Sequence, residues 1–267
     1  MRHASSVLVR FPREQALARV DLGHEPDGVS RQLQAARLLE ARGVPAARLL
    51  FPDAAPIDTE VGRLVFWELL EDTGRPPTAI ELGRLARQLH DATATDRPPG
   101  LRCVDLIAMV PDALQGDDPR LPALRARCVA LRRRLDARIH PGAADLVLCH
   151  ADLHRDNVVV TPEGPKMVDL EHAGLGPRSL ELAPMLVMER RYGASPSCLE
   201  GFLRSYGADL GPALLASPGL DDLGEAYALL VLAWSYLHRD LSPEMTEEAE
   251  VRMEDFLGRP SRPWRLL

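Results

Sequence analysis

The pattern of apolar and polar positions divides the chain into two parts of unequal length. In the first part, β-prone runs at residues 5–11 and 16–21 flank a polar Pro-Arg-Glu-Gln turn, which predicts a hairpin. Apolar positions at helical spacing predict a helix over residues 29–42 that ends at Gly43. We therefore expect a small β-rich lobe, which also contains an extended run after residues 44–51 and a strand over residues 61–70.

The second part has the pattern of helices around a small sheet. Thr78-Ala79-Ile80-Glu81 is a capping-box sequence and predicts a helix to about Thr93. Further helices are expected over residues 121–138, 196–206, 221–239 and 243–257. Three short β-like pieces lie in the middle, over residues 146–149, 158–161 and 166–170, the last two joined by a turn at residues 162–165.

A stretch that contains Pro and Gly separates the two parts. Such a connector is a natural hinge, and ligands commonly bind in the cleft that a hinge spans. The predicted organisation is an N-terminal β-rich lobe over residues 1–70, a connector over residues 71–77 and a helical C-terminal lobe over residues 78–267.

Composition narrows the choice of partner and compartment. The 267 residues carry 39 acidic and 32 basic side chains, a net charge of −7, whereas nucleic-acid binders usually have a basic surface. A small cationic ligand suits an acidic surface better. The N-terminus lacks the apolar run of a signal peptide, no apolar stretch is long enough for a membrane span, and the four cysteines form no CxxC pair. We therefore expect a cytoplasmic protein that binds neither nucleic acid nor membrane.

The residues best suited to catalysis lie between positions 147 and 176. A strand, a polar loop and a hairpin are expected to bring Asp152, Asn157 and Asp169 to the mouth of one small sheet. A carboxylate such as Asp152 can orient an acceptor hydroxyl and take its proton during phosphoryl transfer. Mg²⁺ prefers hard oxygen ligands, which Asn157 and Asp169 supply. The spacing follows the catalytic and metal-binding loops of protein kinases.

The same segment resembles the aminoglycoside phosphotransferase and choline kinase family. The family's H-G-D-x-H-x-x-N motif is similar to H-A-D-L-H-R-D-N at residues 150–157, and its I-D-x-E/D strand is similar to V-D-L-E at residues 168–171. The family's G-x-P…D-L-A tail resembles Gly176-Pro177…Glu181-Leu182-Ala183, with Glu in place of Asp.

This resemblance implies an α+β, bilobal protein kinase-like fold with Mg²⁺ and with ATP or GTP between the lobes. The base would bind backbone groups of the connector near Glu68 and Leu70, and the C-terminal helices would shape the acceptor pocket. By the same resemblance, Asp152 would be the catalytic base, and Asn157 and Asp169 the Mg²⁺ ligands.

Three neighbours of the motif are candidate supporting residues. We expect His150 to hydrogen-bond the loop backbone, His154 to order the loop or contact substrate, and Glu171 to support the metal site or simply end a strand. Alternatively, His150, Asp152 and His154 could form a zinc hydrolase site, although the two histidines lack a third ligand at the spacing of a known zinc motif.

The N-terminal lobe departs from the kinase pattern, which has a glycine-rich loop and a lysine that binds phosphate. The first glycine is Gly23, so Ser5 and Ser6 are the candidate substitutes for the loop. The chain's single lysine, Lys166, lies in the other lobe, and Arg19 takes the expected position. An arginine can bind phosphate bidentately. Its expected helix partner falls at about Gln32, which can accept a hydrogen bond but not form an ion pair.

The acceptor is less defined than the reaction. Acidic residues of the C-terminal helices would attract a polycationic aminoglycoside, and Trp234 and Tyr236 could flank a quaternary amine, although their helical spacing equally suits a core. We expect a phosphotransferase acting on a hydroxyl of an aminoglycoside, amino sugar or similar small metabolite. The alternative is a degenerate, noncatalytic kinase-like binding protein, because the glycine loop and the lysine are absent.

Overall fold

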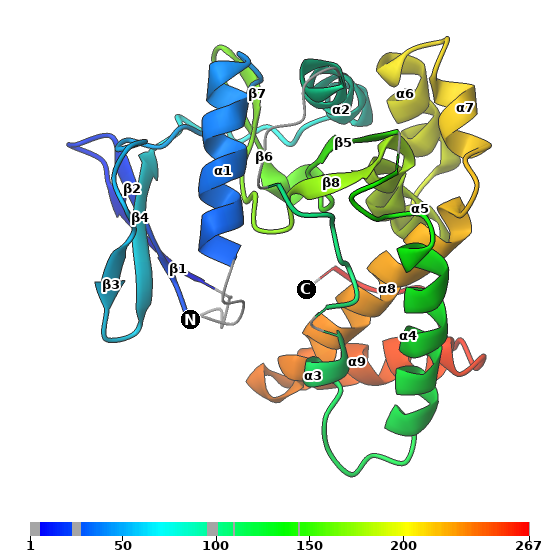
Figure 1. The fold of residues 1–267 in the computed structure, drawn as a ribbon. Coiled ribbons are helices and arrows are strands. Elements are labelled where there is room, and N and C mark those ends of the chain that lie inside the picture. The colour runs from blue at the N-terminus through cyan, green and yellow to red at the C-terminus, as the bar shows by residue number, and fades with distance from the viewer. Residues whose placement is uncertain (1–5, 23–27, 95–100, 109, 144, 267) are drawn as a thin grey trace.

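The computed structural model describes residues 6–22, 28–94, 101–108, 110–143 and 145–266. A sheet and one helix form the N-terminal part, and a mainly helical body follows (Figure 1). The strands are β1 (Ser6–Phe11), β2 (Ala16–Asp21), β3 (Ile57–Thr59), β4 (Gly62–Glu68), β5 (Leu146–Cys149), β6 (Val158–Thr161), β7 (Gly164–Met167) and β8 (Gly174–Pro177). The α-helices are α1 (Gly28–Ala41), α2 (Ala79–Thr93), α3 (Val110–Ala113), α4 (Leu121–Asp136), α5 (Ala183–Arg190), α6 (Pro196–Tyr206), α7 (Gly211–Leu215), α8 (Leu220–Leu237) and α9 (Pro243–Phe256). Short 3-10 turns are η1 (Arg155–Asn157), η2 (Arg178–Leu182) and η3 (Arg239–Leu241).

The N-terminal sheet is antiparallel, with the strand order β1-β2-β4-β3. The predicted hairpin is confirmed, since β1 and β2 pair from Phe11↔Ala16 to Ser6↔Asp21. Most residues of β2 are buried because this strand lies inside the sheet, whereas the edge strand β1 is largely exposed. In β2, Arg19 is opposite Val65 of β4, which places the arginine in the middle of the sheet.

The extended run expected after residues 44–51 is the short strand β3, and the segment that leads into it forms no strand of its own. Residues 44–51 form only isolated bridges, Ala46 with Met167 and Leu49 with Trp67. One hydrophobic cluster contains Leu39 of α1 and Trp67 of β4 together with Leu85 of α2 and further residues of the helical body. The two parts of the chain therefore share a core, because the apolar face of α1 packs toward the helical body.

The capping box at the start of α2 is confirmed. The Thr78 side chain accepts a hydrogen bond from the Glu81 amide, and the Glu81 carboxylate accepts one from the Thr78 amide. Two free amides of the first turn are thereby satisfied. Gly83 of α2 lies so close to Phe202 of α6 that a Cβ atom would meet the Phe202 carbonyl oxygen at 2.3 Å, so this helix pair needs glycine there.

The single small sheet expected in the middle of the chain is two separate ribbons. β5 pairs with β8, and β6 pairs with β7. The sequence pattern misses β8 because its residues, Gly-Leu-Gly-Pro, have low strand propensity. Gly176 nevertheless fits there, since a Cβ would meet Leu180 at 2.7 Å.

None of the helices in the described ranges combines the length and apolar character that a membrane crossing requires.

Candidate active site

Asp152 and Asn157 lie together on the loop between β5 and β6. The Asn157 side-chain amide donates to the Asp152 carboxylate over 2.7 Å and to the Asp152 backbone carbonyl over 2.9 Å. The 3-10 turn η1 ends at Asn157, and the His154 ring caps its start. Because the amide nitrogen faces Asp152, the carbonyl oxygen of Asn157 is the atom left for a cation.

The backbone before Asp152 is held by a buried carboxylate. Glu181 of η2 accepts hydrogen bonds from the amides of His150 and Ala151. His150 donates from its ring to the Val168 carbonyl over 2.9 Å, as expected for a loop-ordering residue. Ala151 has a φ of 66°, a left-handed conformation that disfavours a side chain, at the position where the resemblance has glycine. This conformation directs the chain from β5 into the polar loop.

Sequence reasoning missed two residues of this site. Tyr227 of α8 donates its hydroxyl proton to the Asp152 carboxylate over 2.5 Å, and Glu181 holds the loop from the other side. The resemblance contained Glu181 without a role, whereas Tyr227 is hidden in an apolar helix pattern. The only sequence signal for Tyr227 is a hydroxyl on the buried face of α8.

The environment of Asp152 keeps its carboxyl group ionised. Burial opposes ionisation, but the nearby His154, His172 and the Tyr227 hydroxyl outweigh burial and lower the pKa of Asp152. The His154 ring nitrogen lies 3.5 Å from the carboxylate. Burial lowers the pKa of His154, but the negative charges of Asp152, Asp156 and Asp169 outweigh burial. The pKa of His154 is therefore raised overall. Asp152 is therefore a fixed, charged hydrogen-bond acceptor at neutral pH.

Arg19 bridges β2 to the segment that follows β7. Its guanidinium donates to Asp169 over 2.7 Å and to Glu171 over 2.6 Å, and the arginine is only 8% exposed. Burial opposes the charge, but Asp169 and Glu171 raise the pKa of Arg19 overall. The expected hydrogen bond between Arg19 and Gln32 is not formed. Within the described chain, the side-chain nitrogen of Gln32 is buried without a hydrogen-bond partner. The two carboxylates replace Gln32 because their charges compensate a buried guanidinium, which a neutral amide cannot do.

The remaining nucleotide-site candidates lie at the junction of the two parts. Glu68 ends β4, and its carboxylate accepts hydrogen bonds from the Arg48 side chain and from Lys166. The Leu70 backbone forms no hydrogen bond to any described residue, so its amide and carbonyl are available to a ligand. Ser6 pairs with Asp21 at the start of β1, and Ser5 lies outside the described residues.

A cavity of about 510 Å³ opens over Asp152 and Asp169. Its far walls come from α3, α8 and the C-terminal segment. This volume suits a small-molecule ligand.

The three residues of the alternative zinc site do not gather into one ligand set, although His154 lies close to Asp152. Among the described residues, the His, Cys, Asp and Glu side chains that gather within 4.8 Å are His90, Cys149 and Glu181, all buried. His90 is hydrogen-bonded to Tyr206 over 2.7 Å, and burial, the largest influence, lowers its pKa. His150 faces the Val168 carbonyl instead of joining Asp152 and His154 as a third ligand.

Comparisons with known proteins agree with this geometry. A model of the phosphotransferase enzyme family matches residues 3–216. A protein of Deinococcus radiodurans, described as uncharacterized, is 36% identical over 120 residues, which are 43% of this chain and 34% of that protein. The chain therefore spans about a third of the length of that relative.

Solved structures share the fold at low sequence identity. An amicoumacin kinase in complex with AMP-PNP, Ca²⁺ and Ami has a TM-score of 0.69 at 14% identity, covering 99% of this chain and 92% of that chain. The choline kinase LicA from Streptococcus pneumoniae has a TM-score of 0.61 at 15% identity, covering 96% and 91%. An aminoglycoside-3'-phosphotransferase of type VIII has a TM-score of 0.56 at 22% identity, covering 86% and 89%. The predicted bilobal kinase-like fold is thereby confirmed, and the family match over most of the sequence shows that the chain belongs to the phosphotransferase enzyme family.

Proposed function

We propose that this protein transfers the γ-phosphate of ATP or GTP to a hydroxyl group of a small molecule. The observation that carries the proposal is the arrangement at one end of the cavity. There, Tyr227 and Asn157 hydrogen-bond the Asp152 carboxylate, which His154, His172 and Tyr227 keep ionised, and Asp169 lines the same cavity. These groups match the needs of phosphoryl transfer, which are positioning and charge stabilisation more than covalent chemistry.

Asp152 is the group that receives the acceptor hydroxyl. Its carboxylate orients the hydroxyl toward the phosphate and takes the proton as the new O–P bond forms and the bond to the leaving nucleoside diphosphate breaks. Because Tyr227 and Asn157 fix the carboxylate, little reorganisation is needed at this step. Its lowered pKa makes Asp152 a weak base, which suits a reaction in which the proton moves late.

The oxygen atoms of Asn157 and Asp169, with Glu171 nearby, fit a divalent cation such as Mg²⁺. The donor set is hard, and the Asn157 amide is already turned so that its carbonyl oxygen is available. When bound with nucleotide, the cation would neutralise charge on the phosphates. Arg19 holds Asp169 and Glu171 close together, and its guanidinium is the candidate contact for the nucleotide phosphates.

The connector supplies the candidate site for the nucleotide base. The available backbone groups of Leu70 can form the paired hydrogen bonds that a purine edge requires, beside the ordered Glu68. Ser5 and Ser6 remain candidates for phosphate contacts. For the acceptor we retain hydroxylated antibiotics, amino sugars and similar small metabolites.

The experiment is calorimetric titration of ATP and of GTP with Mg²⁺, combined with measurement of ADP or GDP formation. Asp169→Ala should abolish the Mg²⁺-dependent part of binding. Asp152→Asn should bind nucleotide normally and lose at least about 100-fold in turnover, the usual range for a lost acid–base group. Asp240→Ala is the matched control, because this carboxylate lies on an exposed turn outside the cavity.

One observation favours a noncatalytic binding protein instead. Arg19 occupies one oxygen atom of Asp169 and one of Glu171, carboxylates that a catalytic cation would need. Nucleotide binding that does not depend on Mg²⁺, without any Asp152-dependent formation of ADP or GDP, would support this second function and contradict the first.

A further inference from the structure

The cavity has two chemically different ends, and the far end bears on the acceptor; this inference rests on the proposed function. The reacting end carries Asp152, His154 and Asp169. The far end is mainly apolar and is formed by α8, α3 and the C-terminal segment. The far end must therefore hold the part of the acceptor that does not react.

The acidic residues of the C-terminal helices do not face this cavity. Ten acidic residues belong to this part of the chain: Asp221, Asp222, Glu225, Asp240, Glu244, Glu247, Glu248, Glu250, Glu254 and Asp255. None of the ten lines the cavity, although their charge would attract a polycation. Eight of them pair with arginine within 3.0 Å: Asp221, Asp222, Glu225, Glu247, Glu248, Glu250, Glu254 and Asp255. Their charge is largely neutralised before any ligand arrives, so the expected electrostatic selection of a polycationic aminoglycoside loses its basis.

One wall of the far end is a row of side chains along α8. Trp234 and Leu237 are exposed in the cavity, and the Trp234 ring lies 4.5 Å from the His238 ring at a tilt of 33°. Tyr236, the other aromatic candidate, is buried on a different face, where Arg239 lies 4.1 Å above its ring. The aromatic surface offered to a ligand is therefore one indole with apolar neighbours rather than an aromatic cage.

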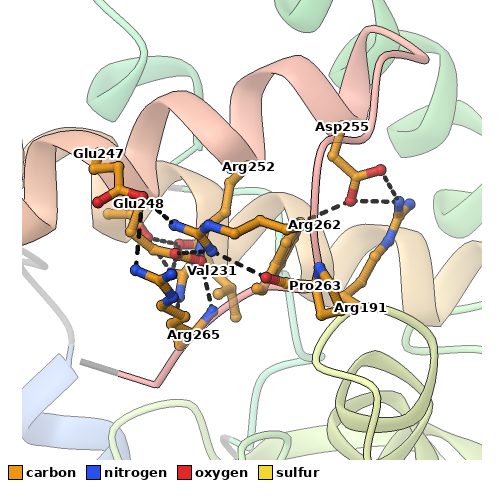
Figure 2. Close-up of polar contacts among 11 residues, drawn as sticks. Arg191, Val231, Glu247, Glu248, Arg252, Asp255, Arg262, Pro263 and Arg265 are labelled. Carbon is orange, nitrogen blue, oxygen red and sulfur yellow. Dashed lines mark hydrogen bonds and ion pairs between the residues drawn. The ribbon is translucent and has the colours of Figure 1, made fainter.

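A second part of the wall is the C-terminal segment, which brings Leu266 to the cavity. Figure 2 shows how this segment is tied to α9. Buried Glu248 accepts hydrogen bonds from Arg252, Arg262 and the Arg265 amide over 2.8–3.0 Å, and Arg252 donates to the Arg265 carbonyl over 2.7 Å. The Leu266 wall is therefore held in place against α9, and the charge of Arg252 is already compensated.

Asp112 of α3 supplies the one negative charge in the cavity that has no described partner. Asp152 is bonded to Tyr227 and Asn157, and Asp169 and Glu171 share Arg19. Asp112 is exposed in the cavity lining and forms no hydrogen bond or ion pair with the described residues. The Asp112 carboxylate can therefore form an ion pair with one positively charged group of a ligand.

We propose that the acceptor is an alcohol with an apolar ring or chain and a single ammonium group. The apolar body packs between Trp234, Leu237 and Leu266, and the ammonium pairs with Asp112. The hydroxyl then reaches Asp152 at the reacting end.

The test compares four probes for binding to the full-length protein with AMP-PNP and Mg²⁺, and for Asp152-dependent ADP formation with ATP. N-benzylethanolamine has a ring and one ammonium, ethanolamine lacks the ring, 2-benzyloxyethanol replaces the amine by an ether oxygen, and kanamycin is a polycation. Burial of the ring should make N-benzylethanolamine about tenfold better than ethanolamine. The single partly solvated ion pair should add about threefold over the ether.

Two variants and one matched control locate the contacts. Leu237→Ala should reduce the preference for the ring, whereas Leu241→Ala should not, although the two leucines are 49% and 44% exposed. Leu241 lies outside the cavity lining. Asp112→Asn should reduce the preference for the amine over the ether and leave the ring preference intact.

The outcomes separate this inference from the proposed function. Equal binding of N-benzylethanolamine and ethanolamine, or tightest binding of kanamycin, overturns the acceptor assignment even when Asp152-dependent turnover is present. Nucleotide binding without Mg²⁺ dependence and without Asp152-dependent turnover contradicts the phosphotransferase proposal itself. Probe binding to the AMP-PNP complex still decides the acceptor question in that case.

Discussion

Asp152 is held by side chains that come from different parts of the chain. Asn157 reaches it from the same loop, and Tyr227 reaches it from α8, 75 residues later. Tyr227 itself is buried, and burial together with Asp152 raises its pKa well above the ordinary value of 10. The tyrosine therefore remains a proton donor to Asp152 over the whole physiological pH range.

We predict that Tyr227→Phe lowers kcat by about 10-fold to 100-fold, the range for a hydrogen bond to a charged group. Nucleotide KM should change little, because Tyr227 contacts Asp152 rather than Asp169. Steady-state kinetics with ATP as the varied substrate give this separation. Tyr236→Phe is the control on the same helix. An equal loss of kcat in that variant would mean that the effect comes from altered packing of α8 and not from the hydrogen bond to Asp152.

At the scale of elements, α8 and α9 have different tasks. α8 carries Tyr227 to the reacting end and Trp234 to the far end of the cavity. α9 lies beside it (Figure 1) and anchors the C-terminal segment through Glu248. The acceptor pocket therefore depends on a buried ion-pair network that does not contact the reacting atoms.

Glu248→Ala should lower the free energy of unfolding by about 3–5 kcal/mol, because it leaves Arg252 buried without its charge partner. The neighbouring Glu247→Ala should cost less than about 1 kcal/mol, since that ion pair is exposed. The side chains are 1% and 57% exposed, respectively (Figure 2). Urea unfolding of both variants measures the difference, and similar losses would mean that the network does not stabilise the fold.

At the scale of the whole molecule, Arg19 links the sheet to the helical body. Its contacts with Asp169 and Glu171 join residues about 150 positions apart in the sequence. Because the guanidinium is buried and the carboxylates are partly exposed, the bridge both fixes the sheet over the cavity and gathers the groups that suit a cation.

We expect Arg19→Met to separate these effects. Asp169 and Glu171 would then repel each other, so the apparent Tm should fall, and added Mg²⁺ should recover part of the loss by pairing with both carboxylates. Nucleotide affinity should weaken if the guanidinium contacts the phosphates. Thermal unfolding with and without Mg²⁺, and calorimetry with ATP, measure the two effects. Arg63→Met, at an exposed position of β4, is the control. An unchanged ATP affinity would remove Arg19 from the nucleotide site.

Local sequence determined much of the secondary structure, because periodicity and capping act over a few residues. The β1–β2 hairpin, the capping box at Thr78 and the helix over residues 196–206 follow from such patterns. The H-A-D-L-H-R-D-N segment also brings Asp152 and Asn157 together, since five positions span a single turn of the chain.

Only the tertiary structure decided which distant groups meet these residues. A pattern along the chain cannot indicate that Tyr227 bonds Asp152, or that Arg19 selects Asp169 and Glu171 over Gln32, because burial and charge compensation act between segments. The same reason applies to the acceptor. In the sequence, the acidic residues of the C-terminal helices indicate a polycationic acceptor. In the fold, these residues form ion pairs with arginines, and apolar side chains of α8 line the cavity instead.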